Sequence, residues 1–297
     1  MYNFKLFIYF ALAFLVYSCN NTANKTSDEI DVSIKEENEE NELTKKIEAI
    51  YFNVPSPMET VVLLKKAGVA YNYDLPLNPN KVNEYFDREE RAVLLGVYGA
   101  DLNYSVVSNK NQETLLYFKS VHMLGEEIGL ANVFNDELKN RVYDNLENND
   151  SMQVIISDAF WNAESSLKED ARLNISALIV AGGWIEGLYI SSQLSKLTPD
   201  NEKIKMLIAE QKYSIANLIY LLDSYNISDY TKEILIKPIK NLEPLFNNIE
   251  EKYSSESVNS ENEDIPVIGA NISLSYSNEI LDSITVAIAQ IREEIIH

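Results

Sequence analysis

The sequence predicts an all-α fold, an antiparallel bundle of several helices with short connections. Helix-start signals recur along the chain, whereas residues 265–274 are the one plausible strand, and they could equally form an extended connection. Two long segments, 92–109 and 173–195, carry one charge each, as is typical of helices buried on most faces. Because 46% of the residues are apolar, the chain can bury the core that such a bundle needs.

Each helix is predicted from its own boundary residues. In the clearest case Ser56 can cap a helix, Pro57 takes its first position, Glu59 completes a capping box and Gly68 ends it. The expected helices are 56–68, 87–109, 111–129, 136–147, 152–168, 171–196, 198–225, 229–249 and 276–297. Two prolines, Pro238 and Pro244, should kink or split the helix at 229–249.

The N-terminus resembles a bacterial lipoprotein signal. An apolar run over residues 4–17 follows a short basic start with Lys5, and the only cysteine, Cys19, comes directly after small Ser18. The run is shorter than the roughly 20 residues of a transmembrane helix. The resemblance implies that residues 1–18 are removed and that Cys19 becomes a lipid-bearing N-terminus, although a plain signal peptide with an incidental cysteine is the alternative.

The rest of the chain divides into two parts. Residues 19–43 are acidic and poor in large apolar side chains, so they are expected to form a disordered tether. Such a stretch after a lipidated cysteine also resembles a surface-export tag of some bacterial lipoproteins. Residues 44–297 are expected to form one helical domain, with 254–264 as a polar surface loop.

The charge of the chain restricts its partners. Without Lys5 the formal net charge becomes −22, from 24 basic and 46 acidic residues. This balance argues against binding to nucleic acid or adsorption to anionic lipid. Basic partners, cations and simple solubility remain as explanations.

The two acids inside the apolar segments are the candidate functional residues. Asp101 has Tyr98 and Tyr104 one helical turn away, and Glu186 has Tyr189 at the same spacing. A buried carboxylate must be hydrogen-bonded, paired, metal-bound or protonated. The two acids could therefore be structural groups that fix helix register, the polar floor of a shared pocket, or a pair that acts on a glycoside or holds a cation.

The candidate pocket also includes Gly183 and Trp184, which precede Glu186 on the same predicted helix. This segment is long enough to span a membrane, with Gly183 and Gly187 in a spacing that occurs in membrane helix pairs. Its polar residues favour a buried helix of a soluble bundle instead.

Other kinds of site have little support in the sequence. The chain has two histidines, His122 and His297, so a histidine-rich metal site is not expected. No phosphate loop, dinucleotide fingerprint or serine-nucleophile pattern occurs, and no cofactor is expected. The 18 tyrosines could line a sugar or peptide groove but are more simply explained by helix packing.

Three segments resemble an uncharacterised family of helical bacterial lipoproteins: Pro55–Thr60, Leu95–Leu102 and Gly182–Gly187. The resemblance implies a helical cell-envelope lipoprotein and carries no activity. The imelysin family also has a Gly-x-His-x-x-Glu motif on a buried helix, but here Trp184 stands near the position of the histidine and Gly182 is one residue too close to Glu186.

The sequence thus predicts a lipid-anchored protein of the bacterial cell envelope, at the outer membrane on its periplasmic or surface side, that acts as a binding or structural component. It would contact the membrane through Cys19 and could have a protein partner in the envelope. Two alternatives remain: a glycosidase-like hydrolase that uses Asp101 and Glu186, and an accessory subunit of an envelope complex.

Overall fold

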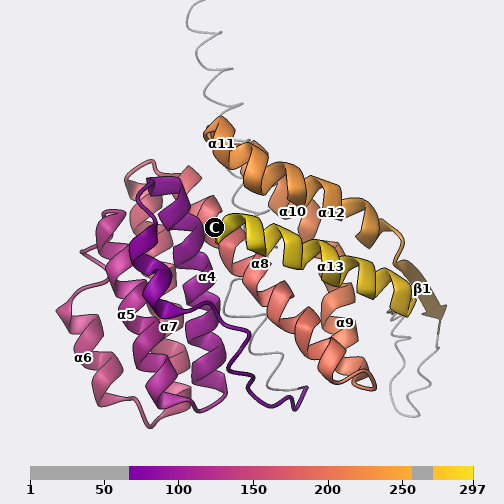
Figure 1. Ribbon diagram of the computed structural model, residues 1–297, viewed down its shortest axis with the longest axis horizontal. Coiled ribbons are helices and arrows are strands. Elements are labelled where there is room, and N and C mark those ends of the chain that lie inside the picture. The colour runs from indigo at the N-terminus through magenta and orange to yellow at the C-terminus, as the bar shows by residue number, and fades with distance from the viewer. Residues whose placement is uncertain (1–66, 256–269, 297) are drawn as a thin grey trace, which may run out of the picture. The chain divides into compact units, whose positions relative to one another are not determined.

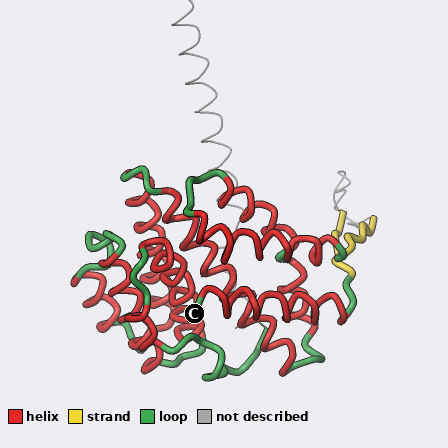
Figure 2. Tube along the Cα trace, turned by 45° about the horizontal axis from the view of Figure 1, so that its top comes forward, coloured by secondary structure: helices red, strands yellow, loops and turns green. Residues whose placement is uncertain are grey.

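The all-α class is confirmed. The computed structural model describes residues 67–255 and 270–296, which belong to one compact unit spanning Ile50–His297. Helices make up most of this part of the chain (Figure 1), and its only strands are a short antiparallel pair at one edge (Figure 2). The expected signal, the tether, the helix at 56–68 and most of the loop at 254–264 lie outside the described residues.

The elements follow one another with short connections. In chain order they are the 3-10 helix η1 (Pro79–Glu84), α4 (Arg88–Val107), α5 (Asn111–Glu127), α6 (Asp136–Asp144), α7 (Asn149–Glu169), α8 (Leu173–Leu197), α9 (Glu202–Glu210), α10 (Lys212–Asp223), α11 (Asp229–Thr231), the π-helical turn η2 (Lys232–Ile236), α12 (Lys237–Asn247), β1 (Glu250–Ser255), β2 (Ala270–Ser275) and α13 (Asn278–Ile295).

The boundary signals work as the sequence indicates. The Asp87 carboxylate caps α4 by accepting hydrogen bonds from the backbone N–H groups of Glu89, at 2.7 Å, and Glu90, at 3.3 Å. Asn201 caps α9 through the N–H of Ile204. Gly129 has φ +85° just after α5, the left-handed conformation in which glycine commonly ends a helix.

The prediction of a single helix at 198–225 is wrong, because the helix is interrupted at Gln211, which separates α9 from α10. The backbone N–H groups of Ser214 and Ile215 both donate to the Gln211 carbonyl, which tightens the turn. The Gln211 side chain is buried there, with its amide donating to the Leu207 carbonyl and its oxygen accepting from Ser214. A polar side chain satisfied within the bend is a contact that helical periodicity does not reveal.

The helix expected at 229–249 is split, as its prolines predict. Pro238 lies in the first turn of α12, directly after the π-helical turn η2, where the missing proline N–H is tolerated, and Pro244 lies within α12.

Strand β1 was not expected from the sequence, whereas β2 overlaps the plausible strand at 265–274. The two strands are antiparallel, and Glu250 pairs with Ser275 at one end of the ladder.

The two nearly uncharged segments form the centre of the bundle, as predicted. Helices α4 and α8 pack against each other, and α8 also contacts α7, α9, α10 and α13, with α4–α7 on one side of α8 and α9–α13 on the other in Figure 1. Among the described helices, α8 is the one long and apolar enough to cross a membrane, and 83% of that stretch is buried within the bundle. This burial fits the interpretation of α8 as a core helix.

The backbones of α4 and α8 approach each other at glycines. A Cβ atom added to Gly96 would lie 1.9 Å from the Ile179 carbonyl oxygen, and one added to Gly182 would lie 1.9 Å from the Val93 carbonyl oxygen. Both obstacles are backbone atoms of the facing helix, so a rotamer change cannot remove them. The two helices can therefore pack at this distance only because neither residue has a side chain.

We expect Gly96→Ala and Gly182→Ala each to lower the free energy of unfolding by about 3 kcal/mol, because overpacking outweighs the higher helix propensity of alanine. Gly99→Ala is the matched control, since its added Cβ would meet the Phe160 ring, which can move. Urea unfolding followed by circular dichroism measures all three. A loss at Gly99 as large as that at Gly96 and Gly182 would contradict the explanation.

Candidate functional site

The structure brings Asp101 and Glu186 together at the centre of the bundle. Asp101 lies on α4 and Glu186 on α8, and both side chains are 0% exposed. The two carboxyl groups lie near enough for Glu186 to raise the pKa of Asp101. The sequence identified both acids as buried, but only the packing of α4 on α8 places them in contact.

A third residue, Arg292 of α13, completes the cluster. Its Nε donates to Glu186 Oε2 at 2.6 Å and its Nη2 donates to Glu186 Oε1 at 2.9 Å, a bidentate ion pair. Nη2 also donates to the Leu75 carbonyl at 3.1 Å, and the guanidinium lies 4.1 Å from the centre of the Tyr189 ring. All the polar groups of this contact are removed from water, with Arg292 itself only 7% exposed.

Arg292 is the residue that sequence reasoning missed. It occupies the buried face of α13 together with Leu281, Ile284, Ile288 and Ile295. A basic residue on the apolar stripe of an amphipathic helix is costly to bury without a partner. The place of Arg292 on this apolar face therefore indicated, in the sequence itself, that Arg292 would pair with one of the buried acids.

Burial and the neighbouring carboxylate favour a proton on Asp101. Burial raises the pKa of Asp101 well above 3.8, and the neighbouring Glu186 carboxylate raises it further, while Arg292 and the Leu77 N–H act in the opposite direction. Burial disfavours the charged guanidinium of Arg292, but Glu186 outweighs this and raises the pKa of Arg292. When Asp101 is protonated, the charges of Glu186 and Arg292 cancel, so the cluster has no net charge.

The hydrogen bonds of Asp101 agree with this protonation state. Its Oδ2 accepts from the Leu77 backbone N–H at 3.0 Å. Within the described residues no N–H or O–H group donates to Oδ1, as expected of the oxygen that carries the proton. Glu186 is the carboxylate that faces Arg292.

This geometry does not suit the carboxylate chemistry considered from the sequence. Glycosidases hold their two carboxyl groups about 5–9.5 Å apart, with the scissile bond between them. Asp101 and Glu186 are instead both 0% exposed, with no room shown for a substrate. Among the described residues no group of three or more His, Cys, Asp or Glu could hold a metal ion, and both oxygens of Glu186 are occupied by Arg292. The arrangement joins α4, α8 and α13.

The other residues of the predicted pocket also use their polar groups internally. The Tyr98 hydroxyl donates to the Asn78 carbonyl at 2.9 Å, so it is not the partner of Asp101 that the helical spacing indicated. Tyr104 accepts from the Asn72 N–H at 3.0 Å. On α8, Trp184 donates to Ser214 at 3.0 Å, and its neighbour Gly183 is buried.

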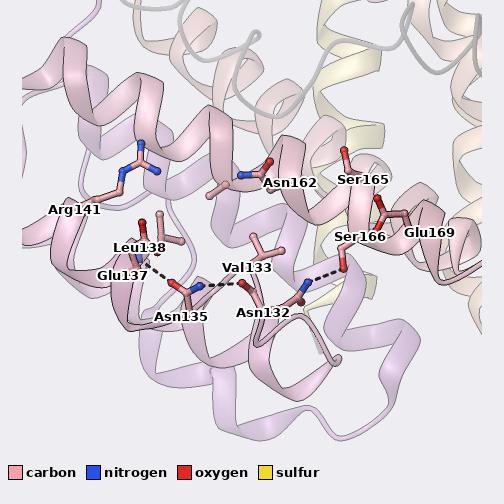
Figure 3. Close-up of a pocket in the computed structure, with 11 residues that line it drawn as sticks. Asn132, Val133, Asn135, Glu137, Leu138, Arg141, Asn162, Ser165, Ser166 and Glu169 are labelled. Carbon is pink, nitrogen blue, oxygen red and sulfur yellow. Dashed lines mark hydrogen bonds between the residues drawn. The ribbon is translucent and has the colours of Figure 1, made fainter.

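The prominent pockets formed by described residues lie elsewhere. One of about 330 Å³ lies between α6, α7 and the loop that precedes α6 (Figure 3). Its lining is mainly polar and includes Asn132, Asn135, Glu137, Arg141, Asn162 and Glu169. These pockets do not include Asp101, Glu186 or Arg292.

Comparisons with protein families, with curated proteins and with solved structures find no match. The fold and the site define an all-helical bundle with a buried acid–acid–arginine cluster in its core.

We expect Asp101→Asn to lose no stability at pH 7, because the asparagine side chain, like the protonated carboxyl group, carries no charge. Glu186→Gln should lower the free energy of unfolding by about 3–5 kcal/mol, since it leaves Arg292 buried without a counter-charge. Urea unfolding of the two variants and the parent chain measures the difference. Equal losses would show that the two acids have equivalent roles.

The raised pKa of Asp101 also predicts a pH dependence. Between pH 3.8 and the higher pKa of the folded state, the native protein binds a proton that the unfolded chain has released, so stability falls as pH rises. The parent chain should lose up to about 1.4 kcal/mol per pH unit relative to Asp101→Asn. Urea unfolding of both chains from pH 5.5 to 8 tests this, and parallel pH profiles would contradict it.

Proposed function

We propose that this protein is a non-enzymatic binding component of the bacterial cell envelope, held on a membrane by a lipid on Cys19. The observation that carries the non-enzymatic part is the closed cluster of Asp101, Glu186 and Arg292. Its acids are 0% exposed, and Glu186 is paired with the guanidinium of Arg292. A group that no substrate reaches cannot act as a catalyst. We therefore assign the function of the domain to its surface.

The anchoring part rests on the sequence. The apolar run that ends at Ser18 and Cys19 resembles a lipoprotein signal, and the acidic residues 19–43 have the composition of a flexible tether. Two acyl chains hold a protein stably on a bilayer where one does so only marginally. A tether of this length lets a domain stand on the order of 30 Å from the membrane, at the outer membrane on its periplasmic or surface side.

The two other functions considered from the sequence have less support. The hydrolase would need Asp101 and Glu186 to be open to a substrate, and both are 0% exposed. An accessory subunit would present a contiguous apolar surface of several hundred Å². The most exposed large apolar side chains of the described residues are Phe86 before α4, Leu197 at the end of α8, Tyr73 before η1 and Tyr230 on α11. Of these four, only Tyr73 and Leu197 line a common pocket.

The full chain expressed in a bacterial host should incorporate labelled fatty acid and fractionate with membranes. Cys19→Ala should lose the label, because the acceptor sulfur is gone. Ser18→Ala is the matched control: it keeps a small residue before the cysteine and should still be labelled. Label retained by Cys19→Ala, or absent from the parent chain, would remove the anchoring part of the proposal.

A further inference from the structure

The chain passes over the buried cluster just before its first described helix. Residues 69–78, here called the strap, form no helix or strand. Leu75 and Leu77 of the strap are buried, at 8% and 4% exposed, whereas Tyr73 is 59% exposed. One side of the strap therefore faces the core of the bundle and the other side faces solvent.

A row of side chains on α4 holds the strap. Three residues of α4 that recur every third position, and so share one face of the helix, bond to the strap backbone: Tyr98, Asp101 and Tyr104. They contact Asn78, Leu77 and Asn72, in that order, at 2.9 to 3.0 Å. The strap thus runs antiparallel to α4, and the helix contacts its backbone groups.

The strap bonds to both the cation and an acid of the cluster. Arg292 on α13 donates to the Leu75 carbonyl at 3.1 Å, and Asp101 accepts from the Leu77 N–H at 3.0 Å. Because the outer side of the strap faces solvent, its removal would break both hydrogen bonds and bring water to Asp101. The strap therefore helps to keep the cluster closed.

The strap has no backbone ladder of its own. Within residues 67–255 and 270–296, no backbone–backbone hydrogen bond involves residues 69–77. Segments without such bonds open at a lower free energy than helices, whose amides are paired along their length. The strap can therefore detach while the helices stay folded.

The groups that surround Asp101 leave its own ionisation as the variable charge. Glu186 faces it from α8 and Arg292 from α13, and these two charges form the ion pair described above. The other titratable groups that sense Asp101 are tyrosines with a raised pKa, which stay neutral around pH 7: Tyr71, Tyr98, Tyr117 and Tyr189.

Ionisation of Asp101 disfavours the closed strap. It leaves two carboxylates beside one guanidinium in a site removed from water. The Leu77 N–H stabilises the ionised form and lowers the pKa of Asp101, but burial raises the pKa and is the larger effect. Water that enters when the strap lifts removes the effect of burial. The closed state therefore favours protonated Asp101, and the open state favours the carboxylate.

We propose that the strap is a proton-controlled latch, which stays closed over the cluster while Asp101 is protonated and detaches from α4 when Asp101 ionises. An extended chain spans at most about 3.3–3.6 Å per residue, so a detached strap adds on the order of 30 Å to the chain that precedes α4. In the proposed lipid-anchored state, the latch would thus set how far the bundle can move from the membrane. Only this consequence rests on the proposed function.

Hydrogen–deuterium exchange of the full chain in detergent tests the latch. Exchange of the strap amides is followed by mass spectrometry from pH 5.5 to 8 and corrected for the intrinsic exchange rate at each pH. We expect protection of the strap to fall by up to about tenfold per pH unit in the parent chain. In Asp101→Asn, which cannot ionise, protection should not change with pH. Helix α7 serves as the internal reference and should keep its protection in both chains.

A second pair of variants tests the attachment without changing Asp101. Tyr104→Phe removes the hydroxyl that accepts from the Asn72 N–H, so it should lower the protection of the strap about fivefold at every pH and leave the pH dependence as in the parent chain. Tyr117→Phe is the matched control. It makes the same change on α5, and among the described residues its hydroxyl has no hydrogen bond to the strap. Its strap should be protected as in the parent chain.

Three outcomes would overturn the inference: strap protection in the parent chain that does not change with pH, the same pH profile in the parent chain and Asp101→Asn, or loss of protection in α7 together with the strap. The last result would show that the whole bundle opens. The first outcome needs no variant, so the test does not depend on how well Asp101→Asn folds. None of the three affects fatty-acid labelling of Cys19, so the anchoring proposal is tested separately.

Discussion

The ion pair between Glu186 and Arg292, extended by the proton on Asp101, is the constraint on which the rest of the bundle depends. A buried charge without a partner costs several kcal/mol, so α4, α8 and α13 have to pack in the one register that brings the three side chains together. Apolar contacts alone would tolerate small shifts of one helix along another. The cluster thus contributes more to the uniqueness of the packing than to its net stability.

The same cluster connects distant parts of the chain. Its outer hydrogen bonds reach the backbone of Leu75 and Leu77, ahead of η1, while Arg292 belongs to the last helix. A second link lies close by, where the Tyr85 hydroxyl donates to the Ile296 carbonyl at 2.5 Å. The segment before α4 and the end of α13 are therefore held by polar contacts, to the core and to each other.

Both acids of the cluster are 0% exposed, and Glu186 is paired with Arg292 inside the bundle. This closure is what supports the proposal that the domain binds its partner at the surface.

The sequence by itself determined the fold class, the two central helices and most helix boundaries, because caps, prolines and apolar periodicity act over a few residues. It also singled out Asp101 and Glu186, since a lone acid in an uncharged helix is conspicuous. It missed the break at Gln211, strand β1 and the role of Arg292, and it left open whether the two acids were structural or formed a pocket with Trp184. Only the tertiary structure decided these, because a polar group is satisfied by whichever partner packing brings within about 3 Å, and residues 101, 186 and 292 meet only when three distant helices do.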